Sequence, residues 1–371
     1  MGRRDEKKLS ALGAADQRMH DLLARDPNSF KRSPSTIGLL AMSLLIVIGF
    51  VCLVGWMIRV SFQPHGWVGW LGVVLGWATV LVMAPRPSRV ADDVDLQTPD
   101  DSPALFAYVE ALAKAVGVAP PKLIGLAPIT NAYVTSIGWR FRPLLVIGTP
   151  LWMVRKGTQL PGVLAHELGH LRHRDTLTGF VHYMAYRIVD QVIYLLTPDH
   201  DADDWAWLSS FLVGPLRAPF VGVRWLLDRL GAPSSRHTEY LADRRAAEAL
   251  GTRELRRALF FDLAGLEAVA NSAMLRGEPP LATLRNLPVP TDADVSATAA
   301  QSDRYVPDPD AGAATHPPTH LRISLLNTYE VEVPADDRLR ALFSAADQEL
   351  QAQLPALERA ATDALRRAIH Q

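Results

Sequence analysis

The sequence predicts a mainly helical α+β protein that contains a small β-sheet and is preceded by a transmembrane helical hairpin. Three observations predict this class. Two long uncharged apolar runs lie near the amino end, at residues 37–58 and 67–84. Short extended segments punctuated by Gly and Pro lie between residues 121 and 150, and most of the remaining chain places apolar residues at helical spacing.

Composition excludes several classes of protein. The chain has 371 residues, of which 49% are hydrophobic, so it is too apolar to be disordered throughout. Its formal charge of -1 gives no overall electrostatic reason to expect a nucleic-acid partner. A single cysteine, Cys52, excludes an internal disulfide and a zinc site built from paired cysteines. Any metal site must therefore use His and carboxylate ligands.

The two apolar runs are interpreted as membrane spans. At about 1.5 Å per residue, the first run is long enough to cross a hydrocarbon core of roughly 30 Å, and the second, which ends before Pro85, is long enough to return. A buried core helix is the alternative for each run, and a signal peptide is a further alternative for the first. The signal peptide is disfavoured because about 36 mostly polar residues precede the run.

The basic residues around these runs predict their orientation. Basic residues are frequent before the first run and follow the second, whereas the short connection contains only Arg59; the flanking set is Arg3, Arg4, Lys7, Lys8, Arg18, Arg25, Lys31, Arg32, Arg86 and Arg89. The positive-inside rule then puts both flanks in the cytoplasm. We therefore expect a multi-pass protein of the cell (inner) membrane whose chain after residue 85 faces the cytoplasm.

After the hairpin, the local patterns predict these elements in order. Residues 103–117 form an amphipathic helix for which Asp101 and Ser102 are the expected caps. A small sheet follows, with a hairpin near Gly138. Thr158 is expected to cap a helix over residues 159–173.

The carboxyl-terminal half is expected to be helical with one irregular segment. Residues 176–231 are apolar but interrupted by charges, so they predict a pair of packed core helices or, alternatively, an element on the membrane surface. Helices are expected over residues 234–250 and 252–269. Amphipathic helices interrupted by Pro355 are expected over residues 335–370.

The motif HExxH, at residues 166–170, predicts a metal site. Its spacing puts His166 and His170 on one face of a helix, where both imidazoles can bind one zinc ion, with Glu167 beside the metal-bound water. Zinc lowers the pKa of that water toward about 7, and a neighbouring carboxylate can take its proton. Chance placement on a solvated helix face is the alternative, but the apolar context VLAHELGHL disfavours it.

A catalytic zinc needs a third protein ligand. The metzincin pattern fails because it requires Gly and His where this chain has His173 and Thr176. The segment SRHTEYLAD offers Glu239 as the ligand and, one turn later, Asp243 as a partner for a ligating imidazole. The alternative is a surface helix on which Asp243 pairs with Arg236 or Arg244.

Together these segments resemble a known family. HELGH followed by RHRD, then SRHTEYLAD and THPPTHLRI, resembles in order and wording the HtpX-like membrane metallopeptidases and their CAAX-prenyl-protease relatives, which are zinc-dependent gluzincins. The resemblance covers roughly residues 35–330. It implies a zincin-like domain in which His166, His170 and Glu239 bind zinc, Glu167 is the general base, and Asp243 supports the ligands.

The resemblance also implies roles for residues in two further segments. Asn131, Ala132 and Tyr133 resemble the start of an edge strand to which an extended substrate adds through main-chain hydrogen bonds. Without the resemblance, Asn131 would be interpreted as the start of a turn. His316, followed by Arg322, resembles a late His-Pro-Pro segment that donates to the oxyanion and contacts substrate; a loop His without that role is the alternative.

The resulting functional hypothesis is a membrane-anchored zinc endopeptidase with one zinc ion. Its partners would be membrane-associated or misfolded protein substrates and the lipid bilayer, with no nucleic acid. Two alternatives are a regulatory sensor protease with one dedicated partner and a non-catalytic membrane adaptor that keeps the fold.

The expected organisation has four parts. A cytoplasmic amino-terminal segment covers residues 1–35, the transmembrane hairpin 36–85, the zinc metallopeptidase domain 86–330, and carboxyl-terminal helices 331–371. Within the domain, residues 277–318 are rich in Pro, Ala, Asp and Thr and are expected to form a mobile loop.

Overall fold

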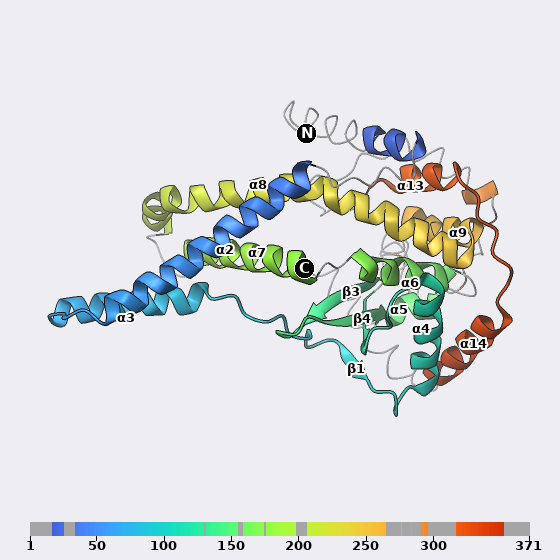
Figure 1. Ribbon diagram of the computed structural model, residues 1–371. Coiled ribbons are helices and arrows are strands. Elements are labelled where there is room, and N and C mark those ends of the chain that lie inside the picture. The colour runs from blue at the N-terminus through green and yellow to red at the C-terminus, as the bar shows by residue number, and fades with distance from the viewer. Residues whose placement is uncertain are drawn as a thin grey trace. The chain divides into compact units, whose positions relative to one another are not determined.

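A computed structural model shows how the chain folds (Figure 1). It describes residues 17–25, 34–129, 131–154, 159–173, 176–197, 206–264 and 317–351, together with residues 276, 283, 286, 291 and 293–295. The chain divides into two compact units. The first consists of Met1–Phe30, Ser88–His173 and Arg236–Gln371, and the second of Lys31–Pro87 and Arg174–Ser235.

The first unit contains a small mixed sheet. Its strands are β1 (Asp95–Gln97), β2 (Leu123–Ala127), β3 (Ala132–Ile137) and β4 (Arg142–Gly148), in the spatial order β1-β2-β4-β3. Strands β2 and β4 are parallel, whereas β1 pairs with β2, and β3 with β4, in antiparallel fashion. The predicted hairpin is confirmed: β3 and β4 are joined through Gly138, whose positive φ of 69° suits a residue without Cβ.

Helices surround this sheet in the first unit. They are α4 (Pro103–Val116), α5 (Thr149–Val154), α6 (Gln159–Gly169), α9 (Thr252–Ala264), α13 (Thr319–Leu326), α14 (Asp337–Gln351) and the end of α8 (Ala206–Leu250); a 3-10 turn, η1 (His170–His173), continues α6. Their apolar faces form one core with the sheet, which includes Leu105, Leu112, Ile147, Leu164, Leu255, Ile323 and Leu350. The apolar residues that recur at helical spacing in the sequence therefore lie in this core.

Helix α4 is capped by a distant carboxylate. Ser102 occupies the N-cap position of α4 as expected, but its hydroxyl makes no capping hydrogen bond and donates instead to Gln97 Oε1 at 2.7 Å. The carboxylate of Glu349 on α14 accepts hydrogen bonds from the backbone N–H groups of Ala104 and Leu105, at 3.0 and 2.9 Å. A negative charge at a helix amino terminus satisfies otherwise unpaired donors and favours the helix dipole. Helix α14 is therefore tied to α4 by polar as well as apolar contacts.

The second unit is a helical assembly. It contains α2 (Pro34–Ser61), α3 (Trp67–Met83), α7 (Thr176–Leu195) and α8 as far as residue 235. Helices α2, α7 and α8 meet at a buried cluster formed by Leu39, Val189 and Leu227. Ser43 Oγ on α2 also hydrogen-bonds His182 Nδ1 on α7 at 2.9 Å, a polar contact of the kind that joins packed apolar helices.

Helix α8 is longer than expected. The sequence predicts separate helices before residue 231 and after residue 234, but α8 continues from Ala206 to Leu250. Gly231 lies where a Cβ would be 3.3 Å from the Tyr186 hydroxyl and 3.7 Å from Leu39. Packing within the second unit therefore outweighs the low helix propensity of Gly at this point.

The second unit exposes large apolar side chains. Leu45 on α2 is 66% exposed and Trp67 on α3 is 81% exposed, and Cys52 also lies exposed on α2. Among the described residues, one helix, Ser35–Ser61, has the length and apolar composition to cross a membrane; the apolar helix Trp67–Met83 is shorter. By length and composition, the first apolar run thus remains a membrane-span candidate.

Candidate metal centre

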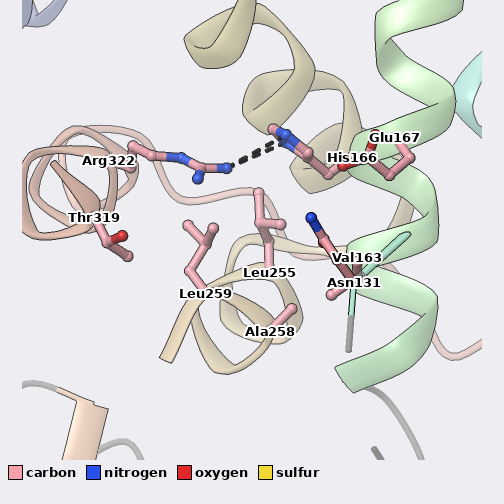
Figure 2. Close-up of a pocket in the computed structure, with 10 residues that line it drawn as sticks. Asn131, Val163, His166, Glu167, Leu255, Ala258, Leu259, Thr319 and Arg322 are labelled. Carbon is pink, nitrogen blue, oxygen red and sulfur yellow. Dashed lines mark hydrogen bonds between the residues drawn. The ribbon is translucent and has the colours of Figure 1, made fainter. Parts of the chain in front are cut away.

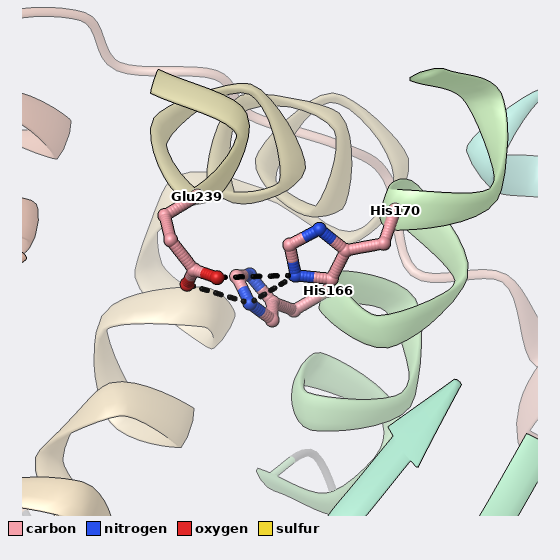
Figure 3. A group of neighbouring side chains, drawn as sticks. All are labelled: His166, His170 and Glu239. Atoms are coloured by element: carbon pink, nitrogen blue, oxygen red, sulfur yellow. Dashed lines mark hydrogen bonds and ion pairs between the residues drawn. The ribbon is translucent and has the colours of Figure 1, made fainter. Parts of the chain in front are cut away.

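Two histidines of the HExxH motif face one another at the end of α6. His166 lies in the last turn of α6 and His170 begins η1, so their rings are one helical turn apart. Their Nε2 atoms are 3.2 Å apart, and the ring planes meet at 87°. Both nitrogens point toward the same space, as Figure 3 shows. The local helical spacing therefore produces the arrangement that the motif predicts.

Glu239 on α8 completes a three-sided cluster. Its Oε2 lies 3.4 Å from His166 Nε2, and its Oε1 lies 3.5 Å from His170 Nε2 (Figure 3). Glu239 is only 4% exposed, so its carboxylate is taken out of water. Buried carboxylates require a partner charge or a metal. The three side chains have the donor set and proximity to hold one metal ion.

Close packing at Gly169 brings α8 to this position. A Cβ on Gly169 would lie 3.1 Å from Ala242 Cα and 3.3 Å from Ala242 Cβ. Because these contacts include backbone, a larger side chain would push α6 and α8 apart. Gly169 therefore sets the distance between the helix that carries the histidines and the helix that carries Glu239.

Asp243 supports His166 from the side opposite the cluster. Its Oδ1 lies 2.9 Å from His166 Nδ1, which leaves Nε2 of the same ring directed at Glu239. Hydrogen bonding at the second nitrogen fixes the orientation of a ligating imidazole. The surface-helix alternative fails here, because Asp243 is 2% exposed and Arg244 pairs with Glu248 instead.

Arg322 on α13 contacts both Asp243 and Glu239. Its Nε donates to Asp243 Oδ2 at 2.8 Å and its Nη2 donates to Asp243 Oδ1 at 2.7 Å, while Nη2 is 3.9 Å from Glu239 Oε2. Burial by itself raises the pKa of Asp243, but the charge and hydrogen bonds of Arg322 outweigh burial and lower it to about 2. Asp243 is thus held as a carboxylate.

The two histidines have opposite pKa shifts. Burial, with the neighbouring His166, lowers the pKa of His170 to about 3. Burial and Arg322 also lower the pKa of His166, but Asp243 and Glu239 outweigh them and raise it. The carboxylates therefore favour positive charge at the cluster.

A pocket of about 250 Å³ adjoins the cluster (Figure 2). His166, Glu167, Asn131 and Arg322 contribute polar groups to its wall. The remaining wall is largely aliphatic or small and comes from α6, α9 and α13: Gly162, Val163, Leu255, Ala258, Leu259 and Thr319. Glu167 is half-buried, lies beside His166 and lines the same pocket.

The structure brings most of the sequence-predicted residues together. Asn131 lines the pocket and its Oδ1 accepts a hydrogen bond from Ala132 N at 2.8 Å, at the start of strand β3. Tyr133 follows on the same strand with 36% of its side chain exposed. Strand β3 ends the strand order of the sheet, next to the pocket. His316 lies outside the described residues.

Two features of this site are absent from the sequence prediction. Arg322 is predicted to contact substrate, but its guanidinium is also paired with Asp243. The aliphatic wall supplied by Leu255, Ala258 and Leu259 is not predicted at all, although these residues share one face of the predicted helix that starts at residue 252. Their helical spacing was the available signal, but it does not distinguish a pocket wall from a core.

The fold and the His, His, Glu cluster define a zincin-like domain with a candidate metal centre. A family model of peptidase family M48 matches residues 99–330. The chain belongs to this family, whose members are metallopeptidases.

Curated relatives carry the name Protease HtpX homolog. The relative from Halobacterium salinarum is 32% identical over 176 residues, covering 46% of this chain and 56% of the relative. The relative from Acidiphilium cryptum is 32% identical over 159 residues, covering 40% and 52%, and that from Acaryochloris marina is 29% identical over 205 residues, covering 52% and 66%. The chain thus spans about half to two thirds of the length of these relatives.

Proposed function

We propose that this chain is a membrane-anchored zinc-dependent endopeptidase. The observation that carries the proposal is the closeness of three candidate ligand side chains: the Nε2 atoms of His166 and His170 are 3.2 Å apart, and each lies within 3.5 Å of one of the two carboxylate oxygens of Glu239. Ligands about 2.0–2.2 Å from a tetrahedral zinc ion lie about 3.3–3.6 Å from one another. His166, His170 and Glu239 would therefore hold a zinc ion through two imidazole nitrogens and one carboxylate oxygen, which would leave room for a water or substrate ligand.

The chain's own residues have distinct roles in the proposed reaction. Zinc, when bound, supplies an acidified water and polarises the carbonyl of the scissile bond. A carboxylate oxygen of Glu167 accepts the proton of the attacking water and then donates it to the leaving amine. Asp243 holds His166 through Nδ1, and Arg322 keeps Asp243 ionised. Arg322 also lines the pocket, where its guanidinium can stabilise negative charge that develops on the substrate.

Strand β3 and the pocket support a peptide substrate. An extended chain that pairs with β3 receives main-chain hydrogen bonds, and one of its side chains can enter the adjoining pocket. Asn131, Ala132 and Tyr133 would form the start of this substrate-binding strand. Because Val163, Leu255 and Leu259 make much of the wall aliphatic, we propose an apolar residue next to the cleaved bond. Unfolded or membrane-associated proteins expose such residues in extended form.

The apolar helices support the proposal of membrane anchoring. Helices α2 and α3 expose many large apolar side chains, and only a short connection of residues 62–66 separates them. We propose that they form the transmembrane hairpin of residues 36–85, with residues 1–35, the domain over 86–330 and residues 331–371 in the cytoplasm at the inner membrane. The basic residues on both flanks support this orientation.

Replacement of Glu167 by Gln tests the reaction. Because Glu167 is not one of the three ligands, the variant should retain one zinc ion per chain and lose about 10²- to 10⁴-fold in cleavage rate. The measurement is metal content together with turnover of an unfolded protein such as casein, on full-length protein in detergent or bilayer. Glu110→Gln, on an exposed position of α4, is the matched control.

Each alternative has its own outcome in this assay. A zinc-loaded wild-type protein that cleaves no unfolded substrate would contradict the general endopeptidase and favour a sensor with one partner. Unchanged turnover in Glu167→Gln would reject Glu167 as the base. Absence of bound zinc in the wild type, after growth with zinc, would favour the non-catalytic adaptor.

A further inference from the structure

An amino-terminal helix, residues 17–25, belongs to the same compact unit as the metal centre. It is the blue helix at the start of the chain in Figure 1. Its Leu23 is only 4% exposed and forms a buried cluster with Tyr240 of α8 and Leu325 of α13. His20 Nε2 also lies 3.2 Å from Ser324 Oγ. This helix therefore contacts two elements that are distant from it in the sequence.

Both contact points lie next to residues of the metal centre. Tyr240 directly follows the candidate ligand Glu239 on α8. Leu325 lies one turn after Arg322 on α13, so the two side chains leave that short helix from adjacent positions. Leu23 thus contacts α8 and α13 together, and these are the elements that supply Glu239, Asp243 and Arg322.

Helix α13 depends on its packing for its position. It has only eight residues, and isolated helices of that length are not stable in water. Ile323 and Leu326 pack into the main core, whereas Leu325 packs against Leu23. Burial of an apolar side chain such as Leu23 stabilises the elements that it joins. The Leu23 contact is therefore a large part of what holds the outer side of α13.

The amino-terminal helix is equally dependent on this contact. It has nine described residues, also too few for independent stability. Leu22, which precedes Leu23, is 59% exposed, so one face of this helix is buried and another face lies in solvent. Docking and helix formation at residues 17–25 are therefore expected to occur together.

We infer that residues 17–25 are a positioning segment of the metal centre, which clamps α13 against α8 so that Arg322 stays paired with Asp243. This inference rests on the proposed metal site and adds an element outside the matched family region. Undocking of the segment loosens α13 and weakens the ion pair between Arg322 and Asp243. The imidazole ring of His166 is then held less firmly in its orientation. The segment is thereby a means by which the cytoplasmic amino terminus influences metal retention.

Leu23→Asp in the full-length chain tests the inference, with Leu22→Asp as the matched control. We expect Leu23→Asp to accelerate hydrogen exchange of the α13 amides and to lower zinc affinity, measured by chelator competition, about 10- to 100-fold. Leu22→Asp should match the wild type in both readouts. Leu23→Met should restore both, and Leu23→Ala should give an intermediate effect if Leu23→Asp does not fold.

The exchange measurement separates positioning from general stability. Exchange in α4 and α14, which contribute no residue to the buried cluster around Leu23, should stay as in the wild type. Wild-type exchange in α13 in Leu23→Asp, or equal acceleration in α4 and α14, would overturn the inference. Since exchange needs neither zinc nor turnover, failure of the proposed peptidase would appear separately, as a wild-type protein without zinc or activity.

Discussion

Arg322 and Asp243 form a bidentate ion pair in the interior of the first unit. The guanidinium donates from Nε and from Nη2 to separate oxygens of the carboxylate, at 2.8 and 2.7 Å. Arg322 is 5% exposed and Asp243 is 2% exposed. The same carboxylate also contacts His166 Nδ1. Each charge therefore has a defined partner, and removal of either would leave the other buried.

Asp243→Asn should weaken metal binding and the fold together. The variant leaves Arg322 without its main counter-charge, and loss of one partner of a buried ion pair costs about 3–5 kcal/mol of folding free energy. The amide also offers His166 and Arg322 one neutral oxygen acceptor in place of two charged ones, so the His166 ring is held less firmly and zinc affinity should fall about 10- to 100-fold. Chelator competition and denaturant unfolding measure the two effects.

The control for this change is an exposed pair on the same helix. Arg244 and Glu248 lie 2.9 Å apart with substantial exposure, so Glu248→Gln should change stability by less than about 1 kcal/mol. Zinc affinity of Asp243→Asn equal to that of Glu248→Gln would show that His166 is oriented without Asp243.

Gly169→Ala should separate α6 from α8. The added methyl would lie 3.1 Å from Ala242 Cα, so the helices must move apart by a few tenths of an ångström. Because His170 and Glu239 lie on opposite sides of this contact, we expect weaker zinc binding, measured by chelator competition. Gly179→Ala on α7, where a Cβ meets nothing within 4 Å, is the control and should leave zinc affinity unchanged.

Glu349→Gln should loosen the amino terminus of α4. The amide retains one oxygen acceptor but loses the charge and the second acceptor, and loss of such a cap costs about 0.5–2 kcal/mol. The first-turn amides of Ala104 and Leu105 should exchange faster with solvent. Wild-type exchange at these two amides would show that other contacts alone order the start of α4, and Glu110→Gln provides the baseline.

Ala258→Leu should change the substrate side chains that the pocket accepts. A larger side chain at this wall position reduces the free space beside Val163 and Leu255. We expect slower cleavage next to large apolar residues and retained cleavage next to Ala or Gly, measured by mass spectrometry of the products. Ala115→Leu, on the exposed side of α4, is the control. An unchanged cleavage pattern would place the substrate side chain elsewhere.

The sequence predicts those parts of the site that depend on local spacing. His166 and His170 are one helical turn apart by sequence, as are Glu239 and Asp243, so their pairing on shared faces follows from helix geometry. The hairpin at Gly138 is predictable because Gly interrupts a run of extended segments. The motifs also identify Glu239 as the partner of the two histidines, although nothing local to α8 requires it.

The contacts between distant segments could not be predicted in the same way. The pairs Arg322 with Asp243, Glu349 with α4, and Leu23 with Tyr240 each join parts of the chain that share no local period. Ser102 illustrates the difference: its residue type and position predict a helix cap, yet the nearby amide of Gln97 competes for its hydroxyl. Tertiary packing decides which of the available partners such a side chain binds.

The exposed thiol of Cys52 gives the protein a unique attachment point for a probe. Because the chain has no other cysteine, any thiol-reactive spin label or fluorophore that modifies the wild-type protein does so at one place on α2, without any engineered substitution. Quenchers confined to water or to lipid can then report the surroundings of that label directly. Cys52, which lies outside the metal centre, is thus well suited to locate α2 relative to a bilayer.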